Sequence, residues 1–424
     1  MFMEKVLASI ITIGDELLIG QVVDTNSAWM AQELNKIGIP VTHRVAVGDN
    51  WDDIWEALDQ EAKRASIIFI TGGLGPTADD ITKPLLCEYF GGKMVVDQPT
   101  LAHVIHIFEN ILKRPMIERN AKQAEVPDVC KVLKNEKGTA PGMWFEKEGK
   151  VFISLPGVPH EMKGLMKDHV LDLLPTYFKT GYLEHQTLLT YGIGESFLAE
   201  RIAKEEAALP EHIKLAYLPN YGMVRLRLSA FGYEKALLQH EVAQHFEILK
   251  KAVGEFLVTD KDESMETVVA QLLKKSGSTL STAESCTGGY IAHLITSTPG
   301  ASAYYKGTVV SYDNSIKTNV LEVSEAILET DGAVSQATVK QMATKVREIM
   351  QTDYAIAVSG IMGPDGGTAE KPVGLVWMAV ADKRQVIAKS FQFRFDRQRN
   401  ISLTATNALN LLRMLIVDNH STIL

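Results

Sequence analysis

The stretch Ser66-Ile-Ile-Phe-Ile-Thr-Gly-Gly-Leu-Gly75 decides the fold of the first part of the chain. It is an apolar run of strand length that ends directly in glycines. Similar apolar runs at 5–13 and 151–155 are separated by segments with helical patterns, such as 25–37. Short buried strands that alternate with helices are typical of a mostly parallel sheet with helices on both faces. We therefore predict an α/β unit over residues 1–178.

Two further units follow this one along the chain. Residues 179–259 alternate as strand, helix, two strands, helix and a short strand, and the two central strands meet at the turn 218–222. This order predicts a small α+β domain related to a split βαβ arrangement. The polar stretch 260–264 is the best linker candidate, and a third α/β unit is predicted over 260–424.

The composition indicates a soluble, cytoplasmic enzyme. The 424 residues are 46% hydrophobic and 22% charged, and 43 basic against 52 acidic side chains give a net charge of −9. An acidic chain without a basic stripe is not expected to bind nucleic acid. The three cysteines form no CxxC pair and are expected to be reduced thiols. No signal-peptide pattern or membrane-spanning run is present in the sequence, so we expect no membrane partner.

The first candidate site is the glycine loop within Thr71-Gly-Gly-Leu-Gly-Pro-Thr-Ala-Asp-Asp80. Glycines at the carboxyl end of a parallel strand let main-chain N–H groups bind phosphate, although no Gly-Lys-Ser/Thr of a Walker A loop follows. Asp79 and Asp80 fit a hard cation placed between carboxylates and phosphates, with Asp15 and Asp24 as weaker ligand candidates. The alternative is a glycine turn followed by an acidic helix start, where aspartate is favoured anyway.

The second candidate site begins at Ser281-Thr-Ala-Glu-Ser-Cys-Thr-Gly-Gly289, where a strand-like run turns into a helix. An amide hydrolase can use a serine nucleophile with a neutral lysine as its base, so Ser285 and Lys317 form a candidate pair. Tyr312 is a candidate for packing on a ring or sharing the proton relay. The main-chain N–H groups of residues 286–289 are candidates for an oxyanion hole. The alternatives are an exposed helical lysine at 317 and, at Cys286, a small buried thiol.

The motifs of the first unit resemble those of the molybdopterin-binding domain family, and more closely the N-terminal domain of the CinA (competence/damage-inducible protein A) family. The matching pieces are Ile13–Leu18, Thr71–Asp80, Asn135–Gly142 and Leu155–Glu161. This resemblance implies an α/β sandwich with ADP-ribose pyrophosphatase activity that requires a divalent metal (Mg, Mn or Co), with K as a further ion. By this analogy the metal ligands are Asp79, Asp80, Asp15 and Asp24, and the phosphate-lining residues are Gly72, Gly73, Gly75 and Thr77. Many CinA-like sequences carry threonine where this chain has Asp15.

The motifs of the third unit resemble the nicotinamide-nucleotide amidase family, the usual C-terminal half of CinA proteins. The matching pieces include Thr282–Gly289, Gly307–Lys317, Ala357–Ile361, Gly363–Gly367 and Lys371–Gly374. The resemblance implies hydrolysis of nicotinamide mononucleotide to nicotinic acid mononucleotide and ammonia, without a cofactor. Ser285 is then the nucleophile and Lys317 the base. The residues expected to line the substrate are Tyr312, Cys286, Thr287, Gly288, Gly289, Gly363, Gly366, Gly367, Arg397 and Arg399.

One position departs from the amidase pattern. Ile401 stands where the family often carries an arginine that is taken to grip the phosphate, so Arg397 or Arg399 is expected to substitute. The resulting prediction is a homodimeric nucleotide-salvage enzyme with two activities and small-molecule nucleotide partners. A second hypothesis is a binding or regulatory module of the molybdenum-cofactor or competence pathways with a vestigial N-terminal site. A DNA-processing role is disfavoured by the negative charge.

Overall fold

The computed structural model describes residues 5–77, 79–220 and 222–421 of the chain, which form two compact units. The first unit comprises Met1–His185 with Ser229–Val242, and the second comprises Gln186–Leu228 with Ala243–Leu424. Ala78 of the predicted glycine loop and Tyr221 of the predicted turn lie outside the described residues. The three-part α/β layout expected from the sequence is confirmed, while the exact limits 178/179 and 259/260 stay predictions.

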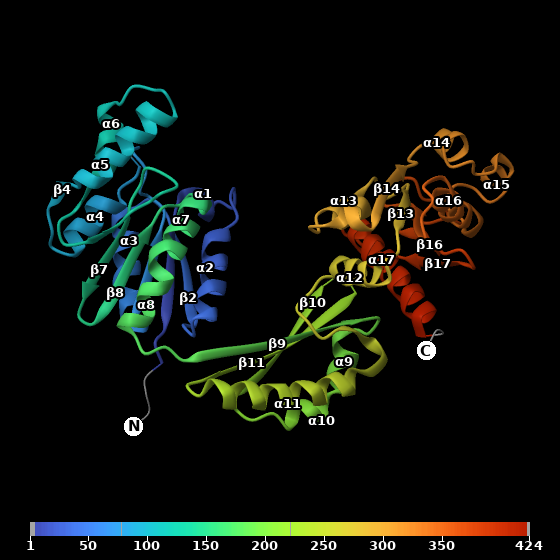
Figure 1. Cartoon of the computed structure of the whole chain (residues 1–424), viewed down its shortest axis with the longest axis horizontal. Coiled ribbons are helices and arrows are strands. Elements are labelled where there is room, and N and C mark those ends of the chain that lie inside the picture. Colours follow the sequence, from blue (N-terminus) through green and yellow to red (C-terminus); the bar gives the residue numbers. More distant parts are fainter. Residues whose placement is uncertain (1–4, 78, 221, 422–424) are drawn as a thin grey trace. The chain divides into compact units, whose positions relative to one another are not determined.

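The N-terminal unit is built on a six-stranded sheet (Figure 1). Its four strands from β2 to β8 are parallel, and the last two pair antiparallel. Strands β1, β3 and β8 lie within apolar runs and are buried on both faces, whereas the edge strand β2 is more polar and partly exposed. In sheet order the strands are β2 (Val41–Val47), β1 (Ala8–Ile13), β3 (Ile67–Thr71), β8 (Lys150–Leu155), β7 (Gly142–Lys147) and β6 (Lys131–Leu133).

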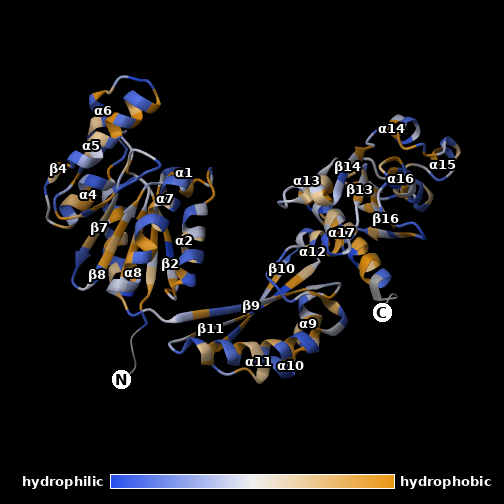
Figure 2. Cartoon of the chain, viewed as in Figure 1, coloured by the Kyte–Doolittle hydropathy of each residue, from blue (hydrophilic) through white to orange (hydrophobic). Residues whose placement is uncertain are grey.

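Helices cover both faces of this sheet and make it the middle layer of a three-layer sandwich. On one face α2 (Thr25–Lys36), α7 (Pro159–Leu165) and α8 (Leu171–Tyr177) pack against alternate strand residues, and α3 (Trp51–Arg64) and α4 (Thr82–Tyr89) cover the other. Figure 2 shows hydrophobic residues along strands β7 and β8, and helices with mixed hydropathy. The remaining elements are α1 (Asp15–Leu18), β4 (Met94–Val96), α5 (Gln98–Ile105), η1 (His106–Ile111), α6 (Glu118–Ala121), η2 (Lys122–Ala124), β5 (Glu125–Pro127) and η3 (Met166–Val170).

The middle segment forms a four-stranded sheet in the order β10-β11-β9-β12. The first helix expected in this segment is divided at Ile202, a buried residue whose main-chain angles leave the helical region. Its elements are β9 (Tyr182–Tyr191), α9 (Glu195–Arg201), α10 (Ala203–Ala207), β10 (Ile213–Asn220), β11 (Met223–Gly232), α11 (Lys235–Val253), η4 (Gly254–Phe256) and β12 (Leu257–Thr259).

The C-terminal domain has a five-stranded sheet in which three parallel strands are followed by two antiparallel ones. One face packs against α12 (Met265–Ser276), α13 (Tyr290–Thr296) and α17 (Arg397–Ser421), and the other against α16 (Gln336–Ile349). The strands in sheet order are β14 (Tyr305–Val310), β13 (Leu280–Glu284), β15 (Tyr354–Gly360), β16 (Leu375–Ala381) and β17 (Val386–Gln392). The short elements are η5 (Ala301–Ala303), α14 (Asn314–Asn319) and α15 (Glu325–Thr330).

The two α/β domains share one feature that places their candidate sites. In each, neighbouring parallel strands end at the same edge of the sheet, so the loops that follow them lie together. None of the helices in the described part of the chain is both long enough and apolar enough to span a bilayer.

Candidate functional site

A cavity of about 410 Å³ lies at the carboxyl ends of β1, β3 and β8 in the N-terminal unit. Its lining combines glycines, which expose main-chain N–H groups, with five carboxylates. Three of the four predicted phosphate-lining residues, Gly72, Gly73 and Gly75, lie on its wall. The carboxylates on the wall are Glu16, Asp49, Asp79, Asp80 and Glu161.

Gly72 and Gly73 have to be glycine because of their main-chain geometry. Gly72 has φ of 117°, and a Cβ atom there would stand 2.2 Å from the carbonyl oxygen of Ile13. Gly73 has φ of 62°, and its Cβ would stand 2.1 Å from Thr82 Oγ1. Side chains are excluded by both strain and contact. The ends of β1 and β3 can therefore approach each other, and the main chain of the loop faces the cavity.

Asp80 holds the glycine loop in shape. Its Oδ1 accepts the Gly75 N–H at 2.7 Å, and its Oδ2 accepts the Thr77 N–H at 2.8 Å and the Thr77 hydroxyl. Thr77 is therefore bound to Asp80 and is absent from the cavity wall, against the prediction that it lines the phosphates. Asp79 is exposed at the cavity, where a hydrogen bond from Thr77 lowers the pKa of its carboxyl. The two adjacent aspartates thus have different tasks.

Asp15 contacts Asp49, a residue that the sequence reasoning missed. The Asp49 N–H donates to Asp15 Oδ1 at 3.2 Å, and the Asp15 N–H donates to Asp49 Oδ2 at 3.2 Å. Burial raises the pKa of Asp49, and the charges of Asp15, Glu16 and Asp79 raise it further. The signal was available in the sequence, because Asp49 comes shortly after the strand-like run 41–47, as Asp15 does after the run 5–13.

Asp24 serves a different purpose from the one predicted. Its carboxylate caps helix α2 by accepting the Ser27 N–H at 2.9 Å, and it lies 3.7 Å from Arg44. It lines a separate cavity of about 130 Å³. Across residues 5–77, 79–220 and 222–421, no group of three or more His, Cys, Asp and Glu side chains is arranged to hold a metal ion. The structure therefore does not bring the four predicted aspartates together as one metal-binding set.

In the C-terminal domain, Ser285 lies at the carboxyl end of β13, between two other parallel strands. Its N–H donates to the Val358 carbonyl of β15 at 3.0 Å, and on the other side the Ser311 N–H donates to the Glu284 carbonyl at 2.8 Å. Ser285 is 9% exposed. The serine is thus held on both sides by the sheet and remains accessible at its edge.

Lys317 is buried at the end of the strand next to the one that carries this serine. It lies in α14, whose N-terminus is capped by Asp313, and is 1% exposed. Its Nζ donates to the Ser311 carbonyl at 2.7 Å and to the Tyr312 carbonyl at 3.3 Å, rather than to the Ser285 hydroxyl. Burial lowers the pKa of Lys317, while the charge of Asp313 opposes this shift. The default interpretation of an exposed helical lysine is wrong for this residue.

Glu284 is a second functional residue that the sequence reasoning missed. This buried carboxylate accepts the Thr287 hydroxyl at 2.6 Å and the N–H groups of Gly289, Ile291 and Ala292 at 3.1, 3.0 and 2.8 Å. It neutralises the positive end of helix α13. A carboxylate at the end of the strand-like run, directly before Ser285, was the available signal.

Two of the four N–H groups predicted for the oxyanion hole are already used in hydrogen bonds of this turn. Gly289 donates its N–H to Glu284, and Gly288 donates its N–H to the Ser285 carbonyl at 3.2 Å. In the part of the chain that the structure describes, the N–H groups of Cys286 and Thr287 have no acceptor. Burial raises the pKa of the Cys286 thiol to about 12, which fits the alternative of an unreactive buried cysteine.

Arg397 joins two of the predicted loops. Its Nη1 donates to the Gly363 carbonyl at 2.9 Å and its Nη2 to the Tyr312 hydroxyl at 3.1 Å. The strand-end loop that carries Gly363 also carries Gly366 and Gly367, and Gly363 and Gly366 have positive φ angles of 83° and 91°. Arg397 therefore brings the start of α17 to the loops on either side of Ser285.

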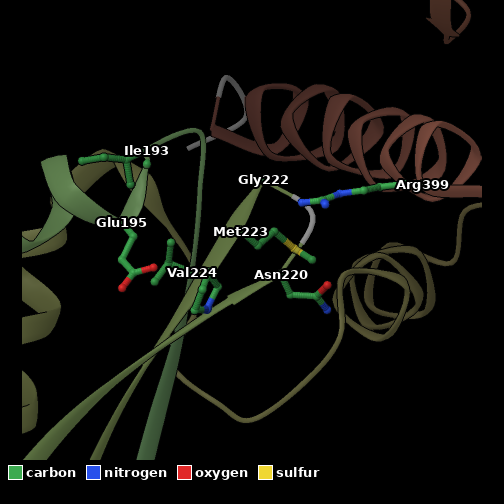
Figure 3. Close-up of a pocket in the computed structure, with 9 residues that line it drawn as sticks. Ile193, Glu195, Asn220, Gly222, Met223, Val224 and Arg399 are labelled. Carbon is green, nitrogen blue, oxygen red and sulfur yellow. The ribbon is translucent and has the colours of Figure 1, made fainter. Parts of the chain in front are cut away.

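Arg399, the other predicted phosphate contact, belongs elsewhere. It lines a cavity of about 500 Å³ with residues of the middle segment, and Figure 3 shows it extending from α17 toward Asn220 and Gly222. Its guanidinium lies 4.1 Å from the centre of the Phe395 ring. Ile401 packs against the hydrophobic core. Since successive helical residues are rotated by about 100°, residues two apart point to different sides.

Three family models match successive parts of the chain. They are the probable molybdopterin binding domain over 9–176, the damage-inducible protein CinA KH domain over 185–258, and the CinA C-terminal domain over 262–416. Among curated proteins, the CinA-like protein of Cytophaga hutchinsonii is 48% identical over 408 residues, covering 96% of this chain and 97% of its own. The CinA-like protein of Flavobacterium psychrophilum is 44% identical over 415 residues, covering 98% and 99%.

A solved structure of a competence/damage-inducible protein from Agrobacterium tumefaciens also matches. It is 37% identical, with a TM-score of 0.35, and the match covers 36% of this chain and 94% of that one.

Proposed function

The chain belongs to the CinA family, and from this premise we propose that its C-terminal domain deamidates nicotinamide mononucleotide. The observation that carries the proposal is the environment of Lys317. Its side chain is 1% exposed and its Nζ is bound by two main-chain carbonyls at the end of the strand next to Ser285. Burial lowers the pKa of Lys317 and so increases the share of the neutral amine, which is the form that acts as a base.

The two carbonyl contacts fix the orientation of that amine. A neutral amine has two N–H bonds and one lone pair, and the Ser311 and Tyr312 carbonyls accept two donors. The remaining position on the nitrogen is the lone pair, which takes the proton of Ser285 as its oxygen attacks the carboxamide carbon. The carbon–nitrogen bond then breaks, the proton passes to the leaving nitrogen, and ammonia departs. Water hydrolyses the acyl–serine ester to release nicotinic acid mononucleotide.

The other groups at this edge have supporting roles. The developing oxyanion is assigned to the N–H groups of Cys286 and Thr287, because those of Gly288 and Gly289 are used within the turn. Arg397 supplies the positive charge for the substrate phosphate in place of the arginine that is missing at Ile401. This assignment is supported by its contacts with Tyr312 and Gly363.

For the N-terminal unit we propose a nucleotide pyrophosphatase that acts on ADP-ribose with a divalent cation. The glycine loop would bind the phosphates, and Asp79, Asp49 and Glu16 face the same cavity. Small divalent cations are commonly held by one or two carboxylates with the substrate's phosphates, so a closed protein cage is not needed. When bound, such a cation would offset the charge that develops on the phosphate oxygens.

The deciding experiment measures ammonia release from nicotinamide mononucleotide in the presence of EDTA. We expect steady release from the full chain, and a loss of about 10³-fold or more in Ser285→Ala. ADP-ribose hydrolysis with added Mg²⁺, Mn²⁺ or Co²⁺ should remain in the same variant. Release that needs the metal, or that survives the substitution, would refute the Ser285 mechanism.

A binding or regulatory role remains the second candidate for the N-terminal unit alone. It is favoured by one observation: Asp80 accepts three hydrogen bonds that shape its own loop, which leaves Asp79 as the loop's exposed carboxylate at the cavity. Tight ADP-ribose binding without formation of AMP, over the same range of metals, would decide for this role.

A further inference from the structure

Ser311 is a buried serine to which the reaction above assigns no side-chain role. It directly follows β14 and has 0% exposure, and its Oγ has no hydrogen-bond partner in the described part of the chain. A buried hydroxyl without a partner costs roughly 1–3 kcal/mol, so its presence requires an explanation. The carbonyl of the same residue accepts the hydrogen bond from Lys317 Nζ at 2.7 Å. Ser311 is therefore adjacent to the proposed base.

Ser311 and Ser285 occupy neighbouring positions on two parallel strands. The register pairs Glu284 with Val310, and the Ser311 N–H extends the ladder by donating to the Glu284 carbonyl at 2.8 Å. Ser285 and Ser311 each come one residue after this pair. Because paired strands lie about 4.8 Å apart, the two serines are next to each other.

The two hydroxyls also belong to the same face of the sheet. Ala283 and Val309, two residues before each serine, both pack in the cluster beneath α16. Side chains alternate between the faces of a sheet, so Ser285 and Ser311 share that face. Glu284, between Ala283 and Ser285, points to the opposite face, where it binds the N-terminus of α13.

Resting on the deamidase function proposed above, we propose that Ser311 Oγ is the proton relay between Ser285 and Lys317. As Ser285 Oγ bonds to the carboxamide carbon, its proton passes to Ser311 Oγ, and the Ser311 proton passes to the lone pair of Lys317. The reverse transfer protonates the carboxamide nitrogen as its bond to carbon breaks and ammonia leaves. Hydrolysis of the ester by water follows the same path and restores the Ser285 hydroxyl.

The central test is Ser311→Ala in the full chain, compared with Ser311→Thr. We expect kcat for ammonia release to fall about 100-fold or more in Ser311→Ala, with KM changed less than about twofold. The thermal midpoint should not fall, because the substitution removes a hydroxyl that bonds to nothing. Ser311→Thr keeps the hydroxyl and should retain activity within about tenfold of the parent. The matched control is Ser154→Ala, which removes another fully buried, unpartnered hydroxyl from the N-terminal unit and should leave ammonia release unchanged.

A second readout does not depend on the substrate. A fluorophosphonate modifies activated serines, and intact-protein mass reports the rate at which it modifies Ser285 at each pH. In the parent this rate should rise with pH as Lys317 becomes neutral. In Ser311→Ala the rate should be lower and the pH dependence lost, which a purely structural role for Ser311 would not produce.

The outcomes separate this proposal from the proposed substrate. Equal labelling of the parent and Ser311→Ala at every pH would overturn the relay, as would the absence of labelling at Ser285. Labelling that depends on Ser311 in a protein that releases no ammonia would support the relay and refute nicotinamide mononucleotide as the substrate. A Ser311→Ala variant with normal kcat would also overturn the relay.

Discussion

The glycine cavity of the N-terminal unit and the Ser285 site of the C-terminal domain use the same sheet geometry for opposite electrostatics. Each lies where adjacent parallel strands end: β1, β3 and β8 in one, and β14, β13 and β15 in the other. The first presents carboxylates to an open cavity, which favours a cation and phosphates. The second buries a lysine against carbonyls and has a carboxylate that neutralises the nearby helix end. The ends of the parallel strands determine where each site lies, and the side chains there determine its charge.

The largest effect is expected from removing the base of the C-terminal site. Lys317→Ala should lower ammonia release about 10³-fold or more, because in the proposed reaction the proton that leaves Ser285 ends on the Lys317 amine. Metal-dependent hydrolysis of ADP-ribose should be unaffected, and both rates can be measured on one preparation. If both fall together while the chain stays folded, the two sites are not independent and the comparison fails.

Gly72→Ala tests the N-terminal half of the comparison. The new Cβ would stand 2.2 Å from a main-chain carbonyl at a φ of 117°, so we expect a loss of about 3 kcal/mol or more in stability and loss of ligand binding. Gly91→Ala is the control, because it has φ of 70° with no atom within 4 Å of the new Cβ, and should cost only about 1 kcal/mol. Urea unfolding measures both; equal costs would contradict the steric argument.

Lys83 offers a stability test of a buried lysine in the N-terminal unit. It is 6% exposed, and burial lowers its pKa to about 8, below the value of 10.5 expected in the unfolded chain. Between these values the unfolded chain binds more protons, so stability should increase as the pH rises through this window. Between pH 7.5 and 10, the free energy of unfolding of the parent should rise by on the order of 2 kcal/mol relative to that of Lys83→Met. If the unfolding free energies of the two proteins changed with pH in the same way, the lowered pKa of Lys83 would be excluded.

The smallest effect sharpens the assignment of the phosphate contact. Arg397→Gln should raise KM for nicotinamide mononucleotide about tenfold through loss of a charge-assisted hydrogen bond. Arg399→Gln should change KM less than about twofold, because its guanidinium lies on Phe395 at the other cavity. Initial-rate kinetics of the two variants give the comparison, and a larger effect at Arg399 would reverse the assignment.

Much of this layout could be predicted from the sequence because strand ends carry a local signature. The apolar run before Gly72 and the strand-like run before Ser285 indicated buried parallel strands, and the residues after them had to meet at one edge of each sheet. The division of labour between neighbouring residues could not be predicted. Asp79 and Asp80 are adjacent and chemically identical. Only the folded loop shows that Asp80 is the one that accepts the N–H groups of Gly75 and Thr77. Asp24 likewise looks the same in the sequence whether its carboxylate binds a metal or caps a helix.

The choice between Arg397 and Arg399 shows the same limit on a helix. The two residues lie within one turn at the start of α17, so their direction depends on how the helix is rotated against the sheet. Packing of the hydrophobic residues along α17 sets this rotation. The sequence around the two arginines contains no pattern from which the rotation could be predicted. Glu284 was missed because its four donors lie in the turn and the helix that follow it.

The carboxylate of Glu284 has a practical consequence for assays. Sulfate and inorganic phosphate often bind at the first turn of a helix, but here that position in α13 is filled by the protein's own anion. In the C-terminal domain, competition by these buffer ions should therefore act at Arg397, the proposed contact of the substrate phosphate. Phosphate and sulfate are consequently best left out of the buffers for the pH series that the lysine chemistry requires.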